Sequence, residues 1–226
     1  MNQGIDSSNP ADFYQYNLAT YGPDHAYDDF IQNFTAEHYD PKEWVDLFAD
    51  AGAQYFVQVS KHHEGYALFD IPSNITKRTS VAQVPHKNLL QMLFDAADQY
   101  QPHLHKATYF SLPEWFHPDY KKYGFGDSTG AAWPGGLALN PYTNQTLPYT
   151  GYVPVDDFVS DLILPEMQIL AQMGTEIMWV SRPVKSFPVP NQPSYNHHSA
   201  ILEAPTLQPS SQPSISTTWQ HKASKS

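Results

Sequence analysis

The sequence predicts an α/β protein with a parallel sheet, because an amphipathic helix followed by a short apolar strand recurs three times. The helices are expected over residues 41–51, 88–100 and 155–173, and the strands over residues 53–60, 105–111 and 176–180. Successive helix–strand units imply parallel strands joined by right-handed crossovers. A (β/α)8 barrel and a doubly wound sheet both have this local pattern, and periodicity does not separate them.

The first unit has clear boundary signals. Asp40 is a suitable N-cap, Pro41 suits the first helical turn, and Gly52 suits the end of the helix. Apolar or small residues at positions 44, 47, 48 and 51 would share one helix face. Residues 1–40 are polar and aromatic with several turn signals, so we expect a loop there, with one short helix at 26–33.

The second and third units follow the same pattern. One face of the second helix is apolar, with Leu89, Leu90, Leu93, Phe94 and Ala97. The third helix contains Pro165, which predicts a kink or a break, and Gly174 ends it.

The composition changes after Ser181. Residues 182–226 are rich in Pro, Ser, Gln and His, and Glu203 is their only carboxylate. Such a segment has little apolar surface to offset the entropy of ordering, so it is predicted to be a disordered tail. Residues 1–181 would then form the folded domain.

Charge and composition exclude several classes of partner. The net charge of −11 argues against nucleic-acid and anionic-membrane surfaces, which would repel the chain. No apolar run is long enough to span a membrane, and the polar first residues predict no signal peptide. With no cysteines, thiolate metal sites are excluded. No cofactor is expected.

The segment Lys61-His62-His63-Glu64-Gly65 directly follows the first predicted strand. Adjacent side chains point in different directions, so one or both histidines would face a pocket, where they could donate to sugar hydroxyls or to a carboxylate. A pair of surface histidines is the alternative. A metal site is not expected, because the sequence positions no third ligand.

A carboxylate beside aromatic residues follows the second predicted strand. Glu114 and Trp115 lie five and six residues after Tyr109, in the run 109–120. Aromatic rings stack on the apolar face of a pyranose while carboxylates accept from its hydroxyls, so this loop suits sugar recognition. A packed aromatic loop covering the sheet is the alternative interpretation.

Four motifs in order and spacing resemble the family 29 glycoside hydrolases, the retaining α-L-fucosidases, with fungal-type members nearest. The motifs are Asp50–Tyr55, Ser60–Phe69, Tyr109–Trp115 and Gly174–Trp179. The resemblance spans roughly residues 10–180. It implies a (β/α)8 TIM-like barrel, of which residues 1–181 would form about three βα units.

The resemblance also implies an activity, hydrolysis of terminal α-L-fucose from glycans by double displacement. An aspartate attacks the anomeric carbon, a second carboxylic acid protonates the leaving oxygen, and water hydrolyses the glycosyl-enzyme. His62 and His63 would contact fucose hydroxyls, Tyr109 would line the same pocket, and Glu114 and Trp115 would complete the substrate-binding set. A fucosylated glycan or oligosaccharide would be the partner.

The resemblance further implies a secreted or extracellular protein. Three Asn-X-Thr sequons would then be glycosylation candidates, at Asn33, Asn74 and Asn144.

The sequence departs from the family pattern at the nucleophile. The family carries Trp-x-Asp at the end of this strand, whereas here Trp179-Val180 is followed by Ser181. A serine hydroxyl without an adjacent base does not replace the carboxylate. The early His-Trp-Gly motif, the acid/base carboxylate and the later strands are also missing. We therefore expect a chain truncated at both ends and catalytically inactive.

The abrupt change after Val180 suggests a cause in the gene model. Val180-Ser181 can be encoded by GTA-AGT, a common intron start, so the tail would be a translated intron or a shifted frame. Two other functions remain open. One is a non-catalytic sugar-binding pseudoenzyme that uses His62, His63, Glu114 and Trp115; the other is an unrelated metal-dependent hydrolase built on His62 and His63.

Overall fold

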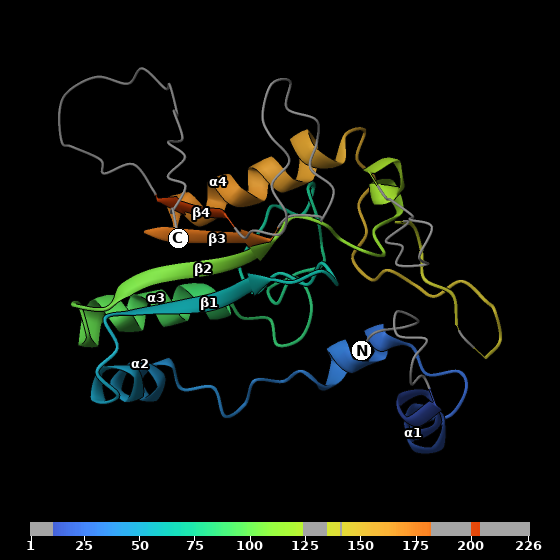
Figure 1. Cartoon of the computed structure of the whole chain (residues 1–226), viewed down its shortest axis with the longest axis horizontal. Coiled ribbons are helices and arrows are strands. Elements are labelled where there is room, and N and C mark those ends of the chain that lie inside the picture. Colours follow the sequence, from blue (N-terminus) through green and yellow to red (C-terminus); the bar gives the residue numbers. More distant parts are fainter. Residues whose placement is uncertain (1–10, 124–134, 141, 182–199, 204–226) are drawn as a thin grey trace, which may run out of the picture.

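The centre of the protein is a four-stranded sheet (Figure 1). The computed structural model describes residues 11–123, 135–140, 142–181 and 200–203. The strands lie in the order β1 (Tyr55–Lys61), β2 (His105–Ser111), β3 (Ile177–Ser181) and β4 (Ala200–Glu203). The first three are parallel, as the helix–strand pattern predicts, and β4 pairs antiparallel with β3.

Each parallel strand follows a helix. These helices are α2 (Pro41–Asp50), α3 (Leu89–Tyr100) and α4 (Leu164–Gln172). The predicted cap of α2 is confirmed, because one carboxylate oxygen of Asp40 accepts from the backbone N–H of Lys42 at 2.9 Å and of Glu43 at 3.2 Å. The structure is therefore a mixed helix and strand fold with a small parallel sheet.

The predicted third helix is interrupted at its proline. A π-helical segment, η3 (Val159–Ile163), runs directly into α4, and Pro165 lies in the first turn of α4. Proline has no N–H to donate to the carbonyl four residues earlier, and its ring crowds that carbonyl. A wider turn immediately before Pro165 relieves this conflict.

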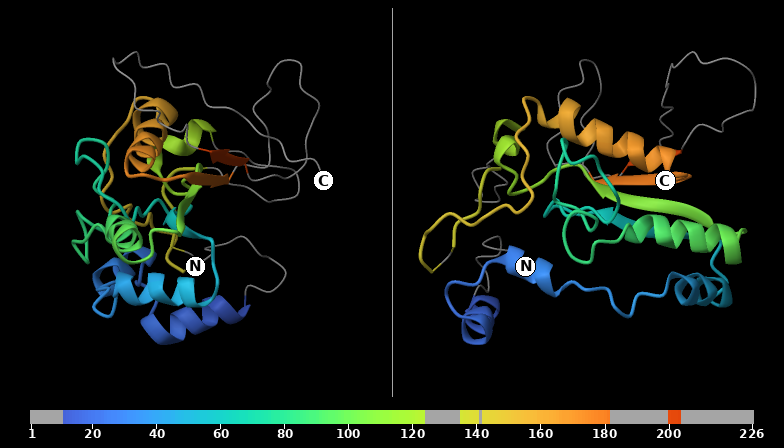
Figure 2. Two further views of the ribbon diagram at one scale, coloured as in Figure 1. Left: turned by 90° about the vertical axis from the view of Figure 1, so that its left-hand side faces the viewer. Right: turned by 180° about the vertical axis from the view of Figure 1, so that it is seen from behind.

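Two helices and the hydrophobic core lie on one face of the sheet. Figure 2 shows α3 and α4 together on the same side of the strands. Strand residues Phe56, Phe110, Met178 and Val180 are buried against them in one cluster. The helices contribute apolar residues such as Leu90, Leu93, Phe94, Leu162 and Leu170.

The opposite face of the sheet is covered by none of the described helices (Figures 1 and 2). Val59, Tyr109 and Trp179 are register partners across β1, β2 and β3, and by strand alternation they share this face. Val59 is 41% exposed and Trp179 is 39% exposed. We call this surface the open face.

A β-bulge near the end of β1 changes which side its last residues occupy. Val59 pairs with Tyr109, but Lys61 pairs with Phe110, so Ser60 is the extra residue. The Ser60 hydroxyl donates to the Tyr109 carbonyl at 2.8 Å and fixes this shift. Lys61 consequently turns towards the interior, where its ammonium lies 4.5 Å from the centre of the Phe110 ring.

The structure also contains elements that the sequence did not predict. A helix, α1 (Ala11–Tyr21), lies in a segment expected to be loop, and the short helix expected at 26–33 is a 3-10 helix, η1 (Tyr27–Asn33). A further 3-10 helix, η2, spans Pro118–Tyr123. Strand β4 lies within the segment expected to be disordered, whose remaining residues are outside the described part of the chain. Within the described ranges, no helix has the length and apolar character needed to cross a membrane.

Candidate functional site

A buried charge cluster lies under the carboxyl ends of the strands. Lys61 is fully buried and its ammonium bonds Glu114 Oε1 at 2.6 Å and Glu166 Oε2. Glu114 Oε2 accepts from the Tyr149 hydroxyl. Glu166 comes from α4 and Tyr149 from the loop before η3. The cluster therefore joins β1, the loop after β2 and α4 through charges that are compensated inside the protein.

The two glutamates differ in their protonation. Burial and the nearby Glu114 charge raise the pKa of Glu166 to about 7, although Lys61 opposes the shift. Burial would also raise the pKa of Glu114, but the charges of Lys61 and His117 and the bonds from Lys61 and Tyr149 lower it. Near neutral pH the Glu114 carboxylate is ionised, whereas Glu166 is close to the midpoint of its titration and is about half protonated.

The two histidines of the Lys61–Gly65 segment have different environments. His63 is buried, stacks on Trp115 with ring centres 4.6 Å apart, and donates from Nδ1 to the Pro113 carbonyl at 3.0 Å. Burial lowers the pKa of His63 to about 4, so its ring is neutral near pH 7. His62 is exposed, and its Nδ1 lies 3.6 Å from Glu64 Oε2.

His62 joins this segment to the open face of the sheet. Its ring stacks on Tyr109 with centres 5.7 Å apart and planes 20° apart. Tyr109 lies beside Trp179, its register partner on β3. The result is a strip of ring side chains at the carboxyl ends of three strands, where active sites of parallel α/β proteins lie.

Ser181, at the expected nucleophile position, lies two residues beyond Trp179 and pairs in register with Ser111. Both hydroxyl oxygens are buried, and neither has a hydrogen-bond partner among the described residues. Buried polar atoms are normally satisfied, so these hydroxyls mark a position suited to a polar ligand or a water molecule.

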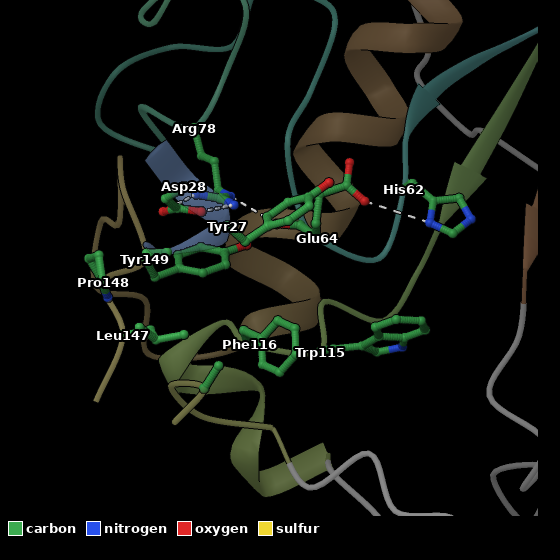
Figure 3. Close-up of a pocket in the computed structure, with 12 residues that line it drawn as sticks. Tyr27, Asp28, His62, Glu64, Arg78, Trp115, Phe116, Leu147, Pro148 and Tyr149 are labelled. Carbon is green, nitrogen blue, oxygen red and sulfur yellow. Dashed lines mark hydrogen bonds and ion pairs between the residues drawn. The ribbon is translucent and has the colours of Figure 1, made fainter. Parts of the chain in front are cut away.

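His62 also lines a cavity of about 310 Å³. Figure 3 shows Trp115, Phe116 and Leu147 along one side and Tyr27, Asp28 and Arg78 along the opposite side. The remaining wall residues are Ala26, His62, Glu64, Ala138, Pro148 and Tyr149.

A buried ion pair holds the far wall of this cavity. Arg78 donates to both carboxylate oxygens of Asp28, each at 2.8 Å, and to the carbonyls of Glu64 at 2.8 Å and Thr150 at 3.1 Å. Its guanidinium also lies 4.2 Å from the centre of the Tyr149 ring. A single arginine therefore fixes three separate segments that line the cavity.

The residues predicted from sequence divide into two groups. His62 and Trp115 line the cavity, and Tyr109 lies on the open face in contact with His62. His63 and Glu114 are buried and are not among the cavity-lining residues. Sugar contact by these five residues stays a prediction. Across the described ranges, no group of three or more His, Asp or Glu residues could hold a metal ion.

Sequence reasoning missed the residues that build the interior of the site. Lys61 belongs to the Lys61–Gly65 segment, but the sequence predicted no functional role for it. It also predicted none for Arg78, Asp28, Tyr149 and Glu166. The signal available for Lys61 was its position at the end of an apolar strand, where a charged side chain needs carboxylate partners. Nothing local identifies Glu166 as such a partner, because it is 105 residues away.

Comparison with known proteins decides the family. The family model described as alpha-L-fucosidase matches residues 1–224. The chain belongs to the α-L-fucosidase family. This membership confirms the resemblance read from the four motifs. The matched range also includes most of the segment expected to be a tail.

Named fucosidases match part of this fucosidase-family chain. The tissue alpha-L-fucosidase of Bos taurus is 42% identical over 109 residues, covering 46% of this chain and 22% of that protein. The plasma alpha-L-fucosidase of Rattus norvegicus is 37% identical over 98 residues, covering 43% and 21%. The chain thus matches about a fifth of the length of these relatives.

A solved fucosidase has a similar fold. The alpha-L-fucosidase isoenzyme 1 from Paenibacillus thiaminolyticus superposes with a TM-score of 0.53 at 22% identity, covering 70% of this chain and 34% of that structure. This likeness supports the fold assignment.

Proposed function

We propose that this chain is the part of an α-L-fucosidase barrel that binds a fucose residue at the carboxyl ends of β1, β2 and β3. The observation that carries the proposal is the stacking of His62 on Tyr109 beside the register pair Tyr109 and Trp179. Ring faces suit the apolar side of a pyranose, and imidazole and phenol groups suit its hydroxyls. The complete protein would release terminal α-L-fucose from glycans.

The position of the helices supports a partial barrel. In a doubly wound sheet the crossover helices lie on both faces, whereas in a (β/α)8 barrel they all lie outside. Here α3 and α4 share one face (Figure 2). By strand register, the other face carries the rings of Tyr109 and Trp179. The open face would correspond to the inside of the barrel. Strand β4 is antiparallel, so it is not one of the barrel strands.

We propose that this exact chain does not hydrolyse fucosides. A retaining glycosidase needs a carboxylate nucleophile and a second carboxyl group about 5–5.5 Å from it. Ser181 occupies the expected nucleophile position, and Glu114 and Glu166 are engaged with Lys61 in the interior. Sugar binding would therefore persist without turnover, which is the pseudoenzyme alternative.

Two measurements on the purified chain test this proposal. Incubation with an aryl α-L-fucoside should release no phenol, and calorimetric titration with L-fucose should show binding in the millimolar range or tighter. Turnover comparable to that of a full-length relative would contradict the inactivity. Absence of fucose binding by a folded sample would contradict the sugar-binding role.

The division into a barrel segment, residues 1–181, and a tail, residues 182–226, is also a proposal. The family match to residue 224 and the pairing of β4 with β3 involve the tail region, so its origin needs a direct test. Spliced transcript reads that continue through codons 180–226 without a junction would exclude a translated intron.

Secretion and glycosylation belong to the same proposal. Asn33, Asn74 and Asn144 are all exposed and so accessible to a glycan. One relative is named as a plasma fucosidase, which is consistent with an extracellular protein. Mass spectrometry of the chain secreted from a eukaryotic host, before and after glycosidase treatment, would identify the occupied sites.

A further inference from the structure

The outer edge of β1 is open along most of its length. β1 is the first strand in the sheet order, so β2 occupies only one of its two edges (Figure 1). On the other edge, Lys61 forms a bridge with Ala67, and the Ser60 carbonyl accepts from the Leu68 N–H at 2.8 Å. Before that point, none of the described strands pairs with residues 55–59 on this side. Such an edge can pair with a strand of another chain.

Three residues of β1 direct their backbone groups to this edge. The Gln54 carbonyl accepts from the His105 N–H of β2 at 3.0 Å. Backbone groups alternate between the two edges of a strand, so the N–H and C=O of Tyr55, Val57 and Val59 point away from β2. These residues could therefore donate to and accept from a further strand.

The side chains of the same three residues suit strand pairing. They are 58% exposed for Tyr55, 37% for Val57 and 41% for Val59, and by strand alternation they lie on the open face. Aromatic and β-branched residues of this kind are favoured in strands. Residues 51–60 contain no Asp, Glu, Lys or Arg, so this edge lacks the charges that usually prevent pairing between chains.

This edge is complementary to a second copy of itself. In an antiparallel pairing centred on Val57, that residue would face Val57 of the second copy, and Tyr55 would face Val59. Each facing pair would exchange two backbone hydrogen bonds, because all the groups involved point outwards. The Val59 carbonyl also accepts from the Gln58 side chain at 3.1 Å, and a carbonyl oxygen can accept a second bond.

Charge also favours pairing at this stretch over other surfaces of the chain. Each copy has a net charge of −11, so two copies repel each other over most orientations. Contact through the uncharged residues 51–60 brings no carboxylate of this stretch against another. The facing side chains would be valine against valine and tyrosine against valine, which are stabilising cross-strand pairs.

We propose that the chain forms a two-fold dimer in which the β1 strands of two copies pair antiparallel about Val57. Two four-stranded sheets would join into one, with both open faces on the same side. The contact is one strand wide, well below the standard interface of about 1,600 Å², so association in the micromolar range is expected. The dimer is independent of fucose binding.

Sedimentation velocity of the intact chain, from about 1 to 100 µM, should show a monomer that converts to a dimer. Val57→Lys would place two ammonium groups opposite each other at the two-fold axis and should keep the chain monomeric. The matched control is Val159→Lys, because Val159 is 44% exposed on η3, outside the sheet, and its replacement should leave the dimer intact. Circular dichroism confirms that each variant is folded.

A charge exchange tests whether position 57 faces itself. Val57→Glu alone should also be monomeric, whereas an equimolar mixture of Val57→Lys and Val57→Glu should dimerise, because opposite charges would then face each other. Recovery in the mixture is a result that a folding defect would not produce. A mixture of folded variants that stays monomeric would overturn the pairing about Val57.

Cross-linking tests the register, and the chain has no cysteine of its own to interfere. Facing residues of a hydrogen-bonded antiparallel pair have Cα atoms about 5.5 Å apart, which suits a disulfide. With oxidised glutathione, Val57→Cys alone should form a covalent dimer and Tyr55→Cys alone should not. Tyr55→Cys mixed with Val59→Cys should cross-link. Equal cross-linking of all these samples would indicate random collision and overturn the register.

Three outcomes of sedimentation would overturn the dimer itself. One is an unaltered chain that stays monomeric over the whole concentration range. Another is a dimer that survives Val57→Lys, because its interface must then lie elsewhere. The third is growth beyond dimers, which would indicate head-to-tail pairing of β1 with β4, the other edge strand of the sheet.

Discussion

Gly65 lies directly against Tyr149. A Cβ atom on Gly65 would overlap the Tyr149 hydroxyl and lie 2.6 Å from Glu114 Oε2, and the backbone there has φ +80°. Glycine is thus required for two reasons, the left-handed backbone and the close approach of the Tyr149–Glu114 pair. The end of the Lys61–Gly65 segment is fixed by the buried cluster.

Gly65→Ala is expected to destabilise the protein by about 3 kcal/mol, the sum of backbone strain and the displacement of Tyr149. Gly52→Ala is the matched control, because Gly52 has a similar φ of +78° but nothing within 4 Å of the added Cβ. It should cost about 1 kcal/mol. Urea unfolding measures the free energy of unfolding of both variants. An equal loss for Gly65→Ala and Gly52→Ala would show that the contact with Tyr149 is unimportant.

Lys61→Met is expected to destabilise the protein by about 3–5 kcal/mol, because it leaves Glu114 and Glu166 buried without a cation. Lys42→Met removes an exposed ion pair with Asp46 and should have no measurable effect. Urea unfolding at pH 7 compares the two variants. A small loss for Lys61→Met would mean that water enters the cluster.

The raised pKa of Glu166 predicts a pH-dependent stability. The group binds a proton more tightly in the folded state, where its pKa is about 7, than in the unfolded chain, where it is about 4.5. Its contribution to stability therefore falls as the pH rises from about 4.5 to 7. His63 has the opposite effect, because its pKa is lowered to about 4 in the folded state. Its contribution to stability therefore rises as the pH increases from about 4 to 6.5. The net profile of the unaltered protein therefore does not isolate Glu166.

The variant Glu166→Gln isolates the Glu166 contribution. Relative to the unaltered protein, it should gain stability as the pH rises from 4.5 to 7, by up to about 3 kcal/mol. Urea unfolding of both proteins at pH 4.5, 5.5 and 7 provides the difference. A constant difference across this range would contradict a proton on Glu166 in the folded state.

Tyr109→Ala should weaken L-fucose binding by about tenfold, since stacked aromatic contacts contribute roughly 0.5–1.5 kcal/mol. Tyr100→Ala removes an exposed tyrosine from α3, away from the carboxyl ends of the strands, and should leave the affinity unchanged. Titration calorimetry on both variants, with circular dichroism to confirm folding, is the measurement. Unchanged affinity for Tyr109→Ala would remove the open face from the sugar site.

The regular elements were the part of the fold best predicted from sequence. Strand β2 has the predicted bounds, and Asp40 caps α2 as expected, because both depend on local pattern and capping chemistry. Helix α1 was missed because its polar and aromatic residues show little amphipathic period. Strand β4 was missed because only its pairing with β3 defines it.

The candidate site was predicted less completely. The motifs contain the ring side chains His62, Tyr109 and Trp115, which lie in or just after strands, and their contact with sugar stays a prediction. The interior partners could not be found from the motifs, because the contacts of Lys61 reach 53 and 105 residues along the chain and depend on which way the side chain turns. Only the folded backbone determines that direction.

The bulge at Ser60 has a practical consequence for protein engineering. Anyone who transplants the five residues Lys61–Gly65 onto another parallel sheet must also copy the irregular strand end before them. On a regular strand the side-chain order would be reversed, with the ammonium of Lys61 in solvent and His62 directed into the host's interior. The portable unit is therefore Val59–Gly65, together with a neighbouring strand whose carbonyl can receive the Ser60 hydroxyl.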